Sequence, residues 1–263
     1  MSLKADDLSY FYAGAGMPAI SAVNLEIRKG ELAVVCGKNG SGKSTLLHCL
    51  AGLAKPSQGR VIIDGRATGK SRRNVGLAIQ FPERALFERT VFDEIAFGPR
   101  NMGLPPDEVK RLTASAIDAV GIGPDLLSVQ PRSLSYGRKR LVAIACAIAH
   151  GPGYLFLDEP AAGLDYQGRR RIADLIRRLN ASGMTIAVAS HDPSDLLDAC
   201  NRLIIIDEGR VVADGPPTLV SLGLAGISSD TIELIRRMKA CGIDVREAFS
   251  PETLADSIAE AVK

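Results

Sequence analysis

The sequence of 263 residues predicts an α/β fold built around a mainly parallel β-sheet, with an inserted helical subdomain and a C-terminal helical appendix. Three observations support this fold class. Short apolar runs of strand length recur along the chain, amphipathic helical patterns lie between some of them, and two stretches carry helical patterns without a convincing strand. Hydrophobic residues make up 46% of the chain and charged residues 24%, which excludes a mainly disordered or fibrous protein.

The predicted strands are short apolar runs that stop at glycine or at polar residues, which is typical of strands buried on both faces. They are Leu32–Cys36, Val61–Ile63, Tyr154–Leu157, Thr185–Ala189 and Leu203–Ile206. A helix is indicated between two of these runs by apolar residues at i, i+3, i+4 and i+7, namely Ile172, Leu175, Ile176 and Leu179. Strands that alternate with helices favour a parallel sheet, because a parallel connection has to cross back over one face.

Two regions are predicted to be helical throughout. Residues 82–150 show helical patterns with proline and glycine breaks, so we expect an inserted helical subdomain there. Residues 216–263 follow Gly215 and form a small helical extension in this interpretation. Within it, Ser250 and Pro251 make a favourable helix start, with serine as the N-cap and proline in the first turn. The predicted domains are therefore residues 1–215 and 216–263.

Charge and cysteine usage exclude several functions. Lys and Arg number 32 against 30 Asp and Glu, so the net charge of +2 creates no overall field that would attract nucleic acid. The basic clusters Arg138–Arg140, Arg169–Arg171 and Arg177–Arg178 are interpreted as solvated helix faces, and no nucleic-acid partner is expected. The five cysteines form no CxxC pair, which disfavours a disulfide framework or a zinc site.

No membrane span and no signal peptide are expected. The longest apolar run, Leu141–Ala149, has nine residues, whereas a bilayer requires about 20. Residues 1–7 carry charges and no apolar segment. If the protein acts at a membrane, another chain must therefore span the bilayer.

A phosphate-binding loop is predicted at Gly37–Thr45, which fills the pattern G-x-x-x-x-G-K-[ST] between a strand and an expected helix at Ser44–Leu50. Glycines let backbone N–H groups wrap an anion, and the helix N-terminus favours negative charge. Lys43 would contact the β- and γ-phosphates, and Ser44 would offer its hydroxyl to Mg²⁺. We therefore predict a P-loop NTPase that binds ATP and Mg²⁺. The expected nucleotide contacts are Gly37, Asn39, Gly40, Ser41, Gly42, Lys43, Ser44 and Thr45.

Two carboxylates end the apolar strand that begins at Leu155. The carboxyl ends of parallel strands meet at one edge of the sheet, beside the phosphate loop. Asp158 is predicted to hold Mg²⁺, through water. Glu159 is predicted to polarise the water that attacks the γ-phosphate, a contribution of about 10²–10⁴-fold in rate.

Further motifs follow in the order found in the ATP-binding subunits of ABC transporters, and residues 3–215 resemble that family. Gln80 is similar to the Q-loop residue that senses Mg²⁺, and His191 to the switch histidine that contacts the γ-phosphate. Leu134–Arg138 stands at the place of the signature motif, and Ala162–Asp165 resembles the D-loop. Tyr12 is similar to the aromatic residue that stacks on adenine, a contact worth about 1–3 kcal/mol by analogy with base stacking.

The resemblance implies an ATPase domain over residues 1–215, with an antiparallel β part near the N-terminus. It also implies two subunits that sandwich two ATP molecules, each site using the phosphate loop of one chain and the signature of the other. The implied catalytic residues are Lys43, Gln80, Glu159 and His191. The implied metal-site residues are Ser44, Gln80 and Asp158, and the implied nucleotide contacts outside the phosphate loop are Tyr12, Ser135, Gly137 and Asp165.

A narrower resemblance, carried by Gln80–Glu83, Val91–Pro99 and Asn101–Leu104, is to the energy-coupling-factor subgroup. ATPases of this subgroup drive uptake of vitamins and of cobalt or nickel ions. The helical extension is similar to the subgroup's C-terminal extension, which helps ATPase subunits pair. The resemblance implies a peripheral protein at the cytoplasmic face of the cell membrane, with two membrane partners: a transmembrane energy-coupling subunit and a substrate-binding subunit.

The resemblance also implies a docking place for the membrane subunit near Gln80–Glu83. Phe81, Pro82, Leu86 and Phe87 would line an apolar groove for a partner helix. The alternative for these four residues is packing inside the helical subdomain.

The signature departs from the family's usual Leu-Ser-Gly-Gly-Gln, because Tyr136 replaces the first glycine and Arg138 replaces the glutamine. The Ser135 hydroxyl and the Gly137 N–H remain, while Tyr136 is expected to place a bulky ring beside the phosphate. Two alternatives stay open. The chain is either a working homodimeric ATPase, or a low-turnover partner of a second, more standard ATPase chain.

A soluble ABC ATPase of DNA repair or translation is the other class considered. The repair type needs a long coiled coil between phosphate loop and signature, but only about 90 residues without heptads separate Thr45 from Leu134. Translation types carry two ATPase domains in one chain, and this sequence has one phosphate loop. We therefore favour the transport ATPase.

Overall fold

The protein is described by a computed structural model that covers residues 1–67, 74–218, 223, 230–241, 245, 248–249 and 251–261. The strands are β1 (Ser2–Tyr10), β2 (Ile20–Arg28), β3 (Leu32–Cys36), β4 (Gln58–Ile63), β5 (Arg66–Ala67), β6 (Val75–Ala78), β7 (Tyr154–Asp158), β8 (Thr185–Ser190), β9 (Arg202–Asp207) and β10 (Arg210–Gly215). The α-helices are α1 (Lys43–Leu50), α2 (Val91–Asn101), α3 (Pro106–Val120), α4 (Tyr136–Ile148), α5 (Tyr166–Ala181), α7 (Asp230–Ala240) and α8 (Pro251–Ala261).

A six-stranded sheet in the order β10-β9-β3-β8-β7-β6 forms the centre of the molecule. All neighbouring pairs in it are parallel except β10 with β9. Every residue of β3, β7 and β8 is buried, because successive side chains enter opposite cores. In β3, for example, Val34 faces one core and Val35 the other. The predicted mainly parallel sheet is confirmed.

A second, antiparallel sheet has the order β2-β1-β4-β5. It confirms the antiparallel N-terminal part that the family resemblance implies. The run Val61–Ile63 belongs to this sheet, so its interpretation as a strand buried on both faces was wrong. Val61 and Ile63 are buried while Ile62 between them is partly exposed, the alternation expected when only one face of a sheet meets the core.

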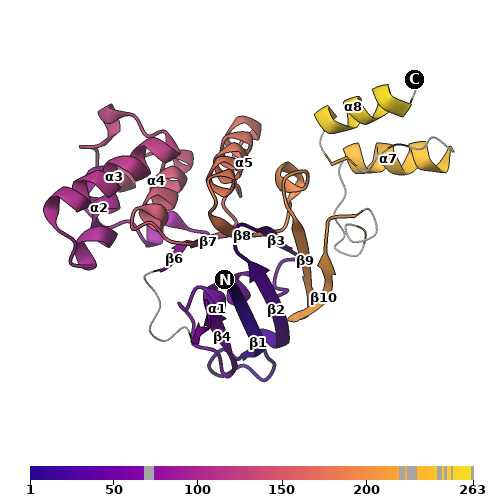
Figure 1. The fold of residues 1–263 in the computed structure, drawn as a ribbon, viewed down its shortest axis with the longest axis horizontal. Helices are drawn as coiled ribbons and strands as arrows, with labels where there is room; N and C mark the ends of the chain where they lie inside the picture. The colour runs from indigo at the N-terminus through magenta and orange to yellow at the C-terminus, as the bar shows by residue number, and fades with distance from the viewer. Residues whose placement is uncertain are drawn as a thin grey trace.

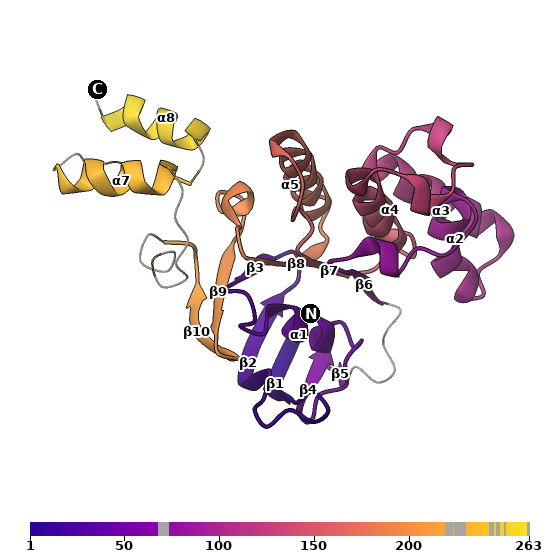
Figure 2. The ribbon, with the colours of Figure 1, turned by 180° about the vertical axis from the view of Figure 1, so that it is seen from behind.

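The layers are visible in Figure 1, where the six-stranded sheet is seen edge-on. Helix α5 lies on one side of it, and α1 with the antiparallel sheet lies on the other. Helices α2, α3 and α4 gather beyond the β6 edge, as both views show (Figures 1 and 2). Residues 82–150 hold these helices and short 3₁₀ turns but no strand, as predicted. The apolar run from Leu141 lies mostly in α4, with most of its side chains buried.

The C-terminal helices α7 and α8 pack against each other and dock on the main domain. Ile235 and Leu254 share a small cluster of their own, whereas Ile232 and Phe249 join the core of the main domain. The carboxylate of Asp198 accepts hydrogen bonds from the Phe249 N–H at 2.8 Å and from the Thr253 hydroxyl at 3.0 Å. Helix α8 begins at Pro251, as predicted, whereas its expected N-cap, Ser250, lies outside the described residues. None of the described helices is long and apolar enough to cross a bilayer.

The Asp198 contacts predict how the extension is held. Asp198→Ala should speed amide hydrogen exchange in residues 248–258 and lower the free energy of unfolding by about 1 kcal/mol, because two hydrogen bonds to a carboxylate are lost. Asp174→Ala is the matched control, since Asp174 forms a surface pair with Arg177 at 2.8 Å away from α8. Equal exchange in the two variants would show that Asp198 does not hold the extension.

Candidate active site

The phosphate loop between β3 and α1 depends on close backbone approaches that only glycine allows. Gly37 has φ +149°, and a Cβ there would lie 2.1 Å from the Ile206 carbonyl oxygen. Gly42, the residue before α1, has φ +107°, and a Cβ would lie 2.5 Å from the Ala19 carbonyl oxygen. The glycine spacing in the motif is therefore explained by contacts with two other segments of the chain.

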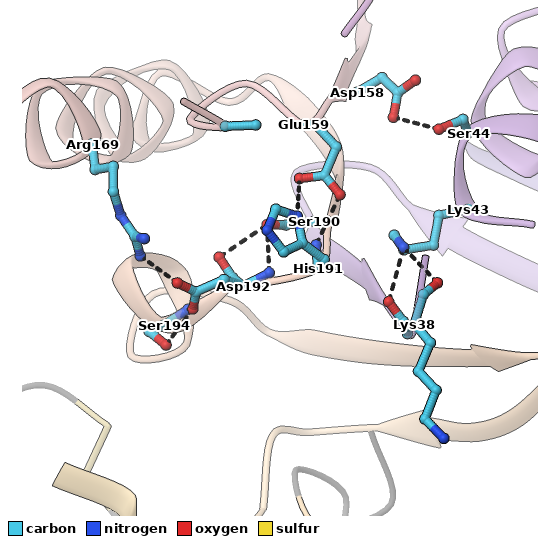
Figure 3. Close-up of polar contacts among 12 residues, drawn as sticks. Lys38, Lys43, Ser44, Asp158, Glu159, Arg169, Ser190, His191, Asp192 and Ser194 are labelled. Atoms are coloured by element: carbon cyan, nitrogen blue, oxygen red, sulfur yellow. Dashed lines mark hydrogen bonds and ion pairs between the residues drawn. The ribbon is translucent and has the colours of Figure 1, made fainter. Parts of the chain in front are cut away.

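The Lys43 side chain bonds to the backbone of its own phosphate loop. Its side chain is 6% exposed, and its ammonium donates to the carbonyl oxygens of Gly37 at 2.8 Å and Lys38 at 3.0 Å (Figure 3). An ammonium carries three N–H donors, so two loop carbonyls leave one donor for an anion. Lys43 thus holds the loop in shape while its charge stays beside the site.

A pocket of about 430 Å³ opens over the loop, within the usual range for small-molecule sites. Its lining residues are Tyr12, Ala19, Asn39, Gly40, Gly42, Lys43, Ser44, Thr45, Gln80 and Glu159. All but Ala19 are predicted site residues. Ala19 carries no chemical signal in the sequence, because its contribution is a position between β1 and β2 near the loop.

Oxygen ligands of the kind that Mg²⁺ prefers meet beside this pocket. The Ser44 hydroxyl donates to Asp158 Oδ1 at 2.9 Å, and Asp158 is 2% exposed (Figure 3). The second oxygen of Asp158 lies 3.6 Å from His48 Nε2, a neighbour that the sequence analysis missed. Gln80 lines the same pocket and offers an amide oxygen. A hydroxyl, a carboxylate and an amide fit a hard divalent cation.

Glu159 and His191 form a direct pair. Glu159 Oε1 accepts the His191 backbone N–H at 2.9 Å, and Oε2 lies 2.8 Å from His191 Nδ1 (Figure 3). Glu159 is 5% exposed and has φ +47°, a strained conformation that costs about 1–3 kcal/mol in a residue with a side chain. Its N–H donates to the Ala189 carbonyl at 2.9 Å, which anchors this turn on β8.

The segment after His191 is held by ion pairs that the sequence analysis missed. Arg169 on α5 pairs with Asp192 at 2.8 Å and with Asp195 at 2.8 Å (Figure 3 shows the first). Burial alone would raise the pKa of Asp192, but the Ser194 hydroxyl and the Arg169 guanidinium hold that pKa below its ordinary value. The interpretation of Arg169 as a merely solvated residue was wrong, because the folded loop brings two carboxylates to it.

Tyr12 stands at the mouth of the pocket. Its hydroxyl hydrogen-bonds to the Thr45 hydroxyl at 2.9 Å, and its ring packs edge-on against Tyr10 with centroids 5.0 Å apart. The ring side chain is 52% exposed, so one face is open to a ligand. The structure therefore favours Tyr12 over its neighbours Tyr10 and Phe11, which do not line the pocket, as the stacking residue.

A sequence profile described as "ABC transporter" matches residues 20–162, the stretch that contains the phosphate loop and both carboxylates. The chain belongs to this family. It is 43% identical to the energy-coupling factor transporter ATP-binding protein EcfA2 of Symbiobacterium thermophilum, over 76% of this chain and 72% of the relative. It is 38% identical to the EcfA2 protein of Clostridium tetani, over 94% of this chain and 92% of the relative.

Solved structures of ABC transporter proteins are also similar to this chain. CbiO1 from Clostridium perfringens, part of the ABC transporter complex cbiONQ, is 33% identical with a TM-score of 0.75, over 91% of this chain and 96% of that one. A dimeric bacterial ABC transporter cassette is 26% identical with a TM-score of 0.74, over 81% of this chain and 98% of that one. The protein is thus an ABC ATPase of the energy-coupling-factor type, of the kind that energises transport.

Three predicted nucleotide contacts of this ABC ATPase lie away from its pocket. Ser135 is the exposed N-cap of α4, with Gly137 in the first turn of that helix. Asp165 caps α5 by accepting the Gly168 N–H at 2.8 Å. None of these three residues lines the pocket over the phosphate loop. The predicted site residues Gly37, Ser41, Asp158 and His191 are also outside its lining, although Asp158 and His191 bond to pocket residues.

The Tyr136 ring, predicted to lie beside the phosphate, has a contact within its own chain. It lies against the chain's own D-loop, where a Cβ on Gly163 would be 3.4 Å from Tyr136 Cε1. Arg140 covers the ring, with its guanidinium carbon 4.9 Å from the ring centroid. The D-loop and Arg140 thus fix the ring within its own chain, and a position beside the phosphate of a partner's nucleotide stays a prediction.

The loop geometry predicts unequal costs for two glycine substitutions. Gly37→Ala should lower the free energy of unfolding by about 3 kcal/mol or more and abolish ATP binding, since the Cβ would collide with the Ile206 carbonyl. Gly40→Ala should cost only about 1–2 kcal/mol, because φ is +82° but no atom lies within 4 Å of the added Cβ. Urea denaturation and ATP titration calorimetry measure both, and equal losses of stability would contradict the assigned contact.

Proposed function

We propose that the chain is the Mg²⁺-ATP-hydrolysing subunit of a transporter that takes up a micronutrient, either a vitamin or a metal ion such as cobalt or nickel. One observation carries the hydrolytic part: Ser44 and Glu159 line one pocket with the phosphate loop, and they bond to Asp158 and His191 respectively. The transport part is supported by relatives named as energy-coupling factor transporter ATP-binding proteins. The class of cargo rests on the sequence resemblance to that subgroup.

Three groups of residues have separate roles in hydrolysis: nucleotide binding, metal binding and activation of the attacking water. Lys43 and the loop N–H groups bind the β- and γ-phosphates, and Tyr12 stacks on the base. Ser44, Gln80 and, through water, Asp158 would hold Mg²⁺, which would neutralise charge that develops on the phosphates. Glu159 orients the attacking water and accepts its proton, and the bond between Glu159 Oε2 and His191 Nδ1 fixes the direction of that carboxylate.

A second ATPase subunit completes each site in this proposal. Ser135, Gly137 and Asp165 lie outside the pocket of their own chain, so they are free to reach the nucleotide of a partner. Ser135 is exposed, and the Tyr136 ring packs against the D-loop of its own chain. This geometry supports a working signature and hence the homodimer, while a heterodimer with a second ATPase chain remains the alternative. The extension formed by α7 and α8 is proposed to help the subunits pair.

An aromatic patch beside the pocket is the proposed docking place for the transmembrane energy-coupling subunit, which in turn would carry the substrate-binding membrane subunit. Phe81, Phe87 and Phe97 are 38%, 56% and 41% exposed, and the last two rings pack edge-on at 4.9 Å. Pro82 and Leu86, also expected in the groove, are buried. Leu86 packs in the hydrophobic core that the helices of the subdomain share with the six-stranded sheet, which supports the packing alternative for that residue. The protein would then lie peripherally on the cytoplasmic face of the membrane.

The hydrolytic proposal predicts the behaviour of a conservative variant. Glu159→Gln should lower the ATP hydrolysis rate about 10²–10⁴-fold and leave ATP binding intact, because the amide keeps the shape of the side chain but accepts no proton. The rate is measured with Mg²⁺-ATP across protein concentrations, and a specific rate that rises with concentration indicates a homodimer. Light scattering of Glu159→Gln with Mg²⁺-ATP checks that dimer directly. Undiminished hydrolysis by the variant would contradict the role of Glu159.

The docking proposal predicts a separation of membrane binding from ATP binding. Phe87→Glu should remove the protein from the membrane fraction of its source cells while ATP binding stays unchanged, because a charge replaces half-exposed aromatic surface. Val212→Glu is the matched control, since Val212 is 53% exposed on β10, away from the aromatic patch. Loss of membrane association in both variants, or in neither, would count against the aromatic patch.

A further inference from the structure

A buried arginine joins the signature helix to the D-loop. Arg140 on α4 is 3% exposed, and its Nη2 donates to the Tyr136 hydroxyl at 2.6 Å and to the Ala162 carbonyl at 3.2 Å. The interpretation of Arg140 as a solvated residue was therefore wrong. Its spacing of i, i+4 from Tyr136 puts both side chains on one helix face, and that face meets the D-loop.

The contact surface between the two segments is continuous. A Cβ on Gly163 would lie 3.4 Å from the Tyr136 ring, and a Cβ on Gly137 would lie 3.6 Å from Leu164 Cδ2. At the other end, the Ala162 N–H donates to the Glu159 carbonyl at 3.2 Å. Ala162 is thus held by Arg140 through its carbonyl oxygen and bonded to the Glu159 carbonyl through its N–H.

Burial of the charged Arg140 guanidinium costs desolvation free energy. Among the described residues Arg140 has no ion pair: its Nη2 bonds to two neutral oxygens, and its Nε has no hydrogen-bond partner. A guanidinium stays charged when buried, so its desolvation is offset only by two oxygen acceptors and by the face of the Tyr136 ring. Buried polar contacts of this kind are better explained by the geometry that they specify than by added stability.

We propose that Tyr136 and Arg140 form a latch, positioning residues that hold the segment 160–165 against the signature helix and so set the place of Glu159. The inference rests on the proposed function, because it assigns the latch to the ATPase reaction. It also gives Tyr136, the departure from the family's glycine, a role inside its own chain. The signature turn and the catalytic carboxylate then keep a fixed spacing within one subunit.

The test compares Tyr136→Phe, Arg140→Met and the double variant with the unaltered protein. Tyr166→Phe is the matched control, because Tyr166 forms the same i, i+4 contact with Arg170, at 3.1 Å, on the exposed first turns of α5. Tyr136→Phe and Arg140→Met should each speed amide hydrogen exchange in residues 160–165. Each should also lower kcat about three- to tenfold and leave KM for ATP within about twofold, since the phosphate loop is untouched.

The double variant should lose no more activity than Arg140→Met alone, because both changes break one contact. Tyr136→Phe removes only the hydroxyl and keeps the ring. This variant alone tests the latch if Arg140→Met does not fold. The latch is overturned by unchanged exchange in residues 160–165, by additive losses in kcat, or by an equal loss in Tyr166→Phe. Absence of ATP hydrolysis by the unaltered protein would contradict the proposed function instead, and hydrogen exchange alone would then decide the latch.

Discussion

Parallel pairing of three central strands is the constraint on which the site depends. Cys36 of β3 lies opposite Ser190 of β8, and Ala189 lies opposite Asp158 of β7, so the three strands end together. The phosphate loop, the two carboxylates and the switch histidine each follow one of these ends. Any slip in register would move one of these groups by a full residue and turn its side chain to the other face.

The groups that would carry out the reaction also hold the site together. Lys43 binds carbonyls of its own loop, Ser44 binds Asp158, and Glu159 binds His191. Each contact places a charged or polar atom at the pocket before any ligand is bound. A prearranged site of this kind has little to reorganise when charge develops on the phosphates, which is the main source of electrostatic catalysis.

In the helical subdomain, away from the pocket, a buried carboxylate holds a loop in place. Glu94 on α2 is 4% exposed and accepts the N–H groups of Phe87 and Glu88 at 2.8 Å and 2.7 Å, which fixes the loop that presents Phe87. Burial raises the pKa of Glu94, although both N–H groups favour its charged form. The aromatic surface and the signature turn are therefore carried by one packed unit, because α2 and α4 contact each other.

The sequence by itself determined the phosphate loop, the carboxylates after β7, the histidine after β8 and the order of motifs that identifies the family. These follow from local spacing, because a loop, a strand and a helix start are each encoded within a few residues. It did not determine that Val61–Ile63 joins the antiparallel sheet, nor that Arg169 pairs with two carboxylates and Arg140 is buried. Those outcomes depend on Asp192, Tyr136 and other groups that become neighbours only in the fold, so tertiary structure decided them. The same holds for the contact of the Tyr136 ring with Gly163 of the D-loop, because these residues become neighbours only in the fold.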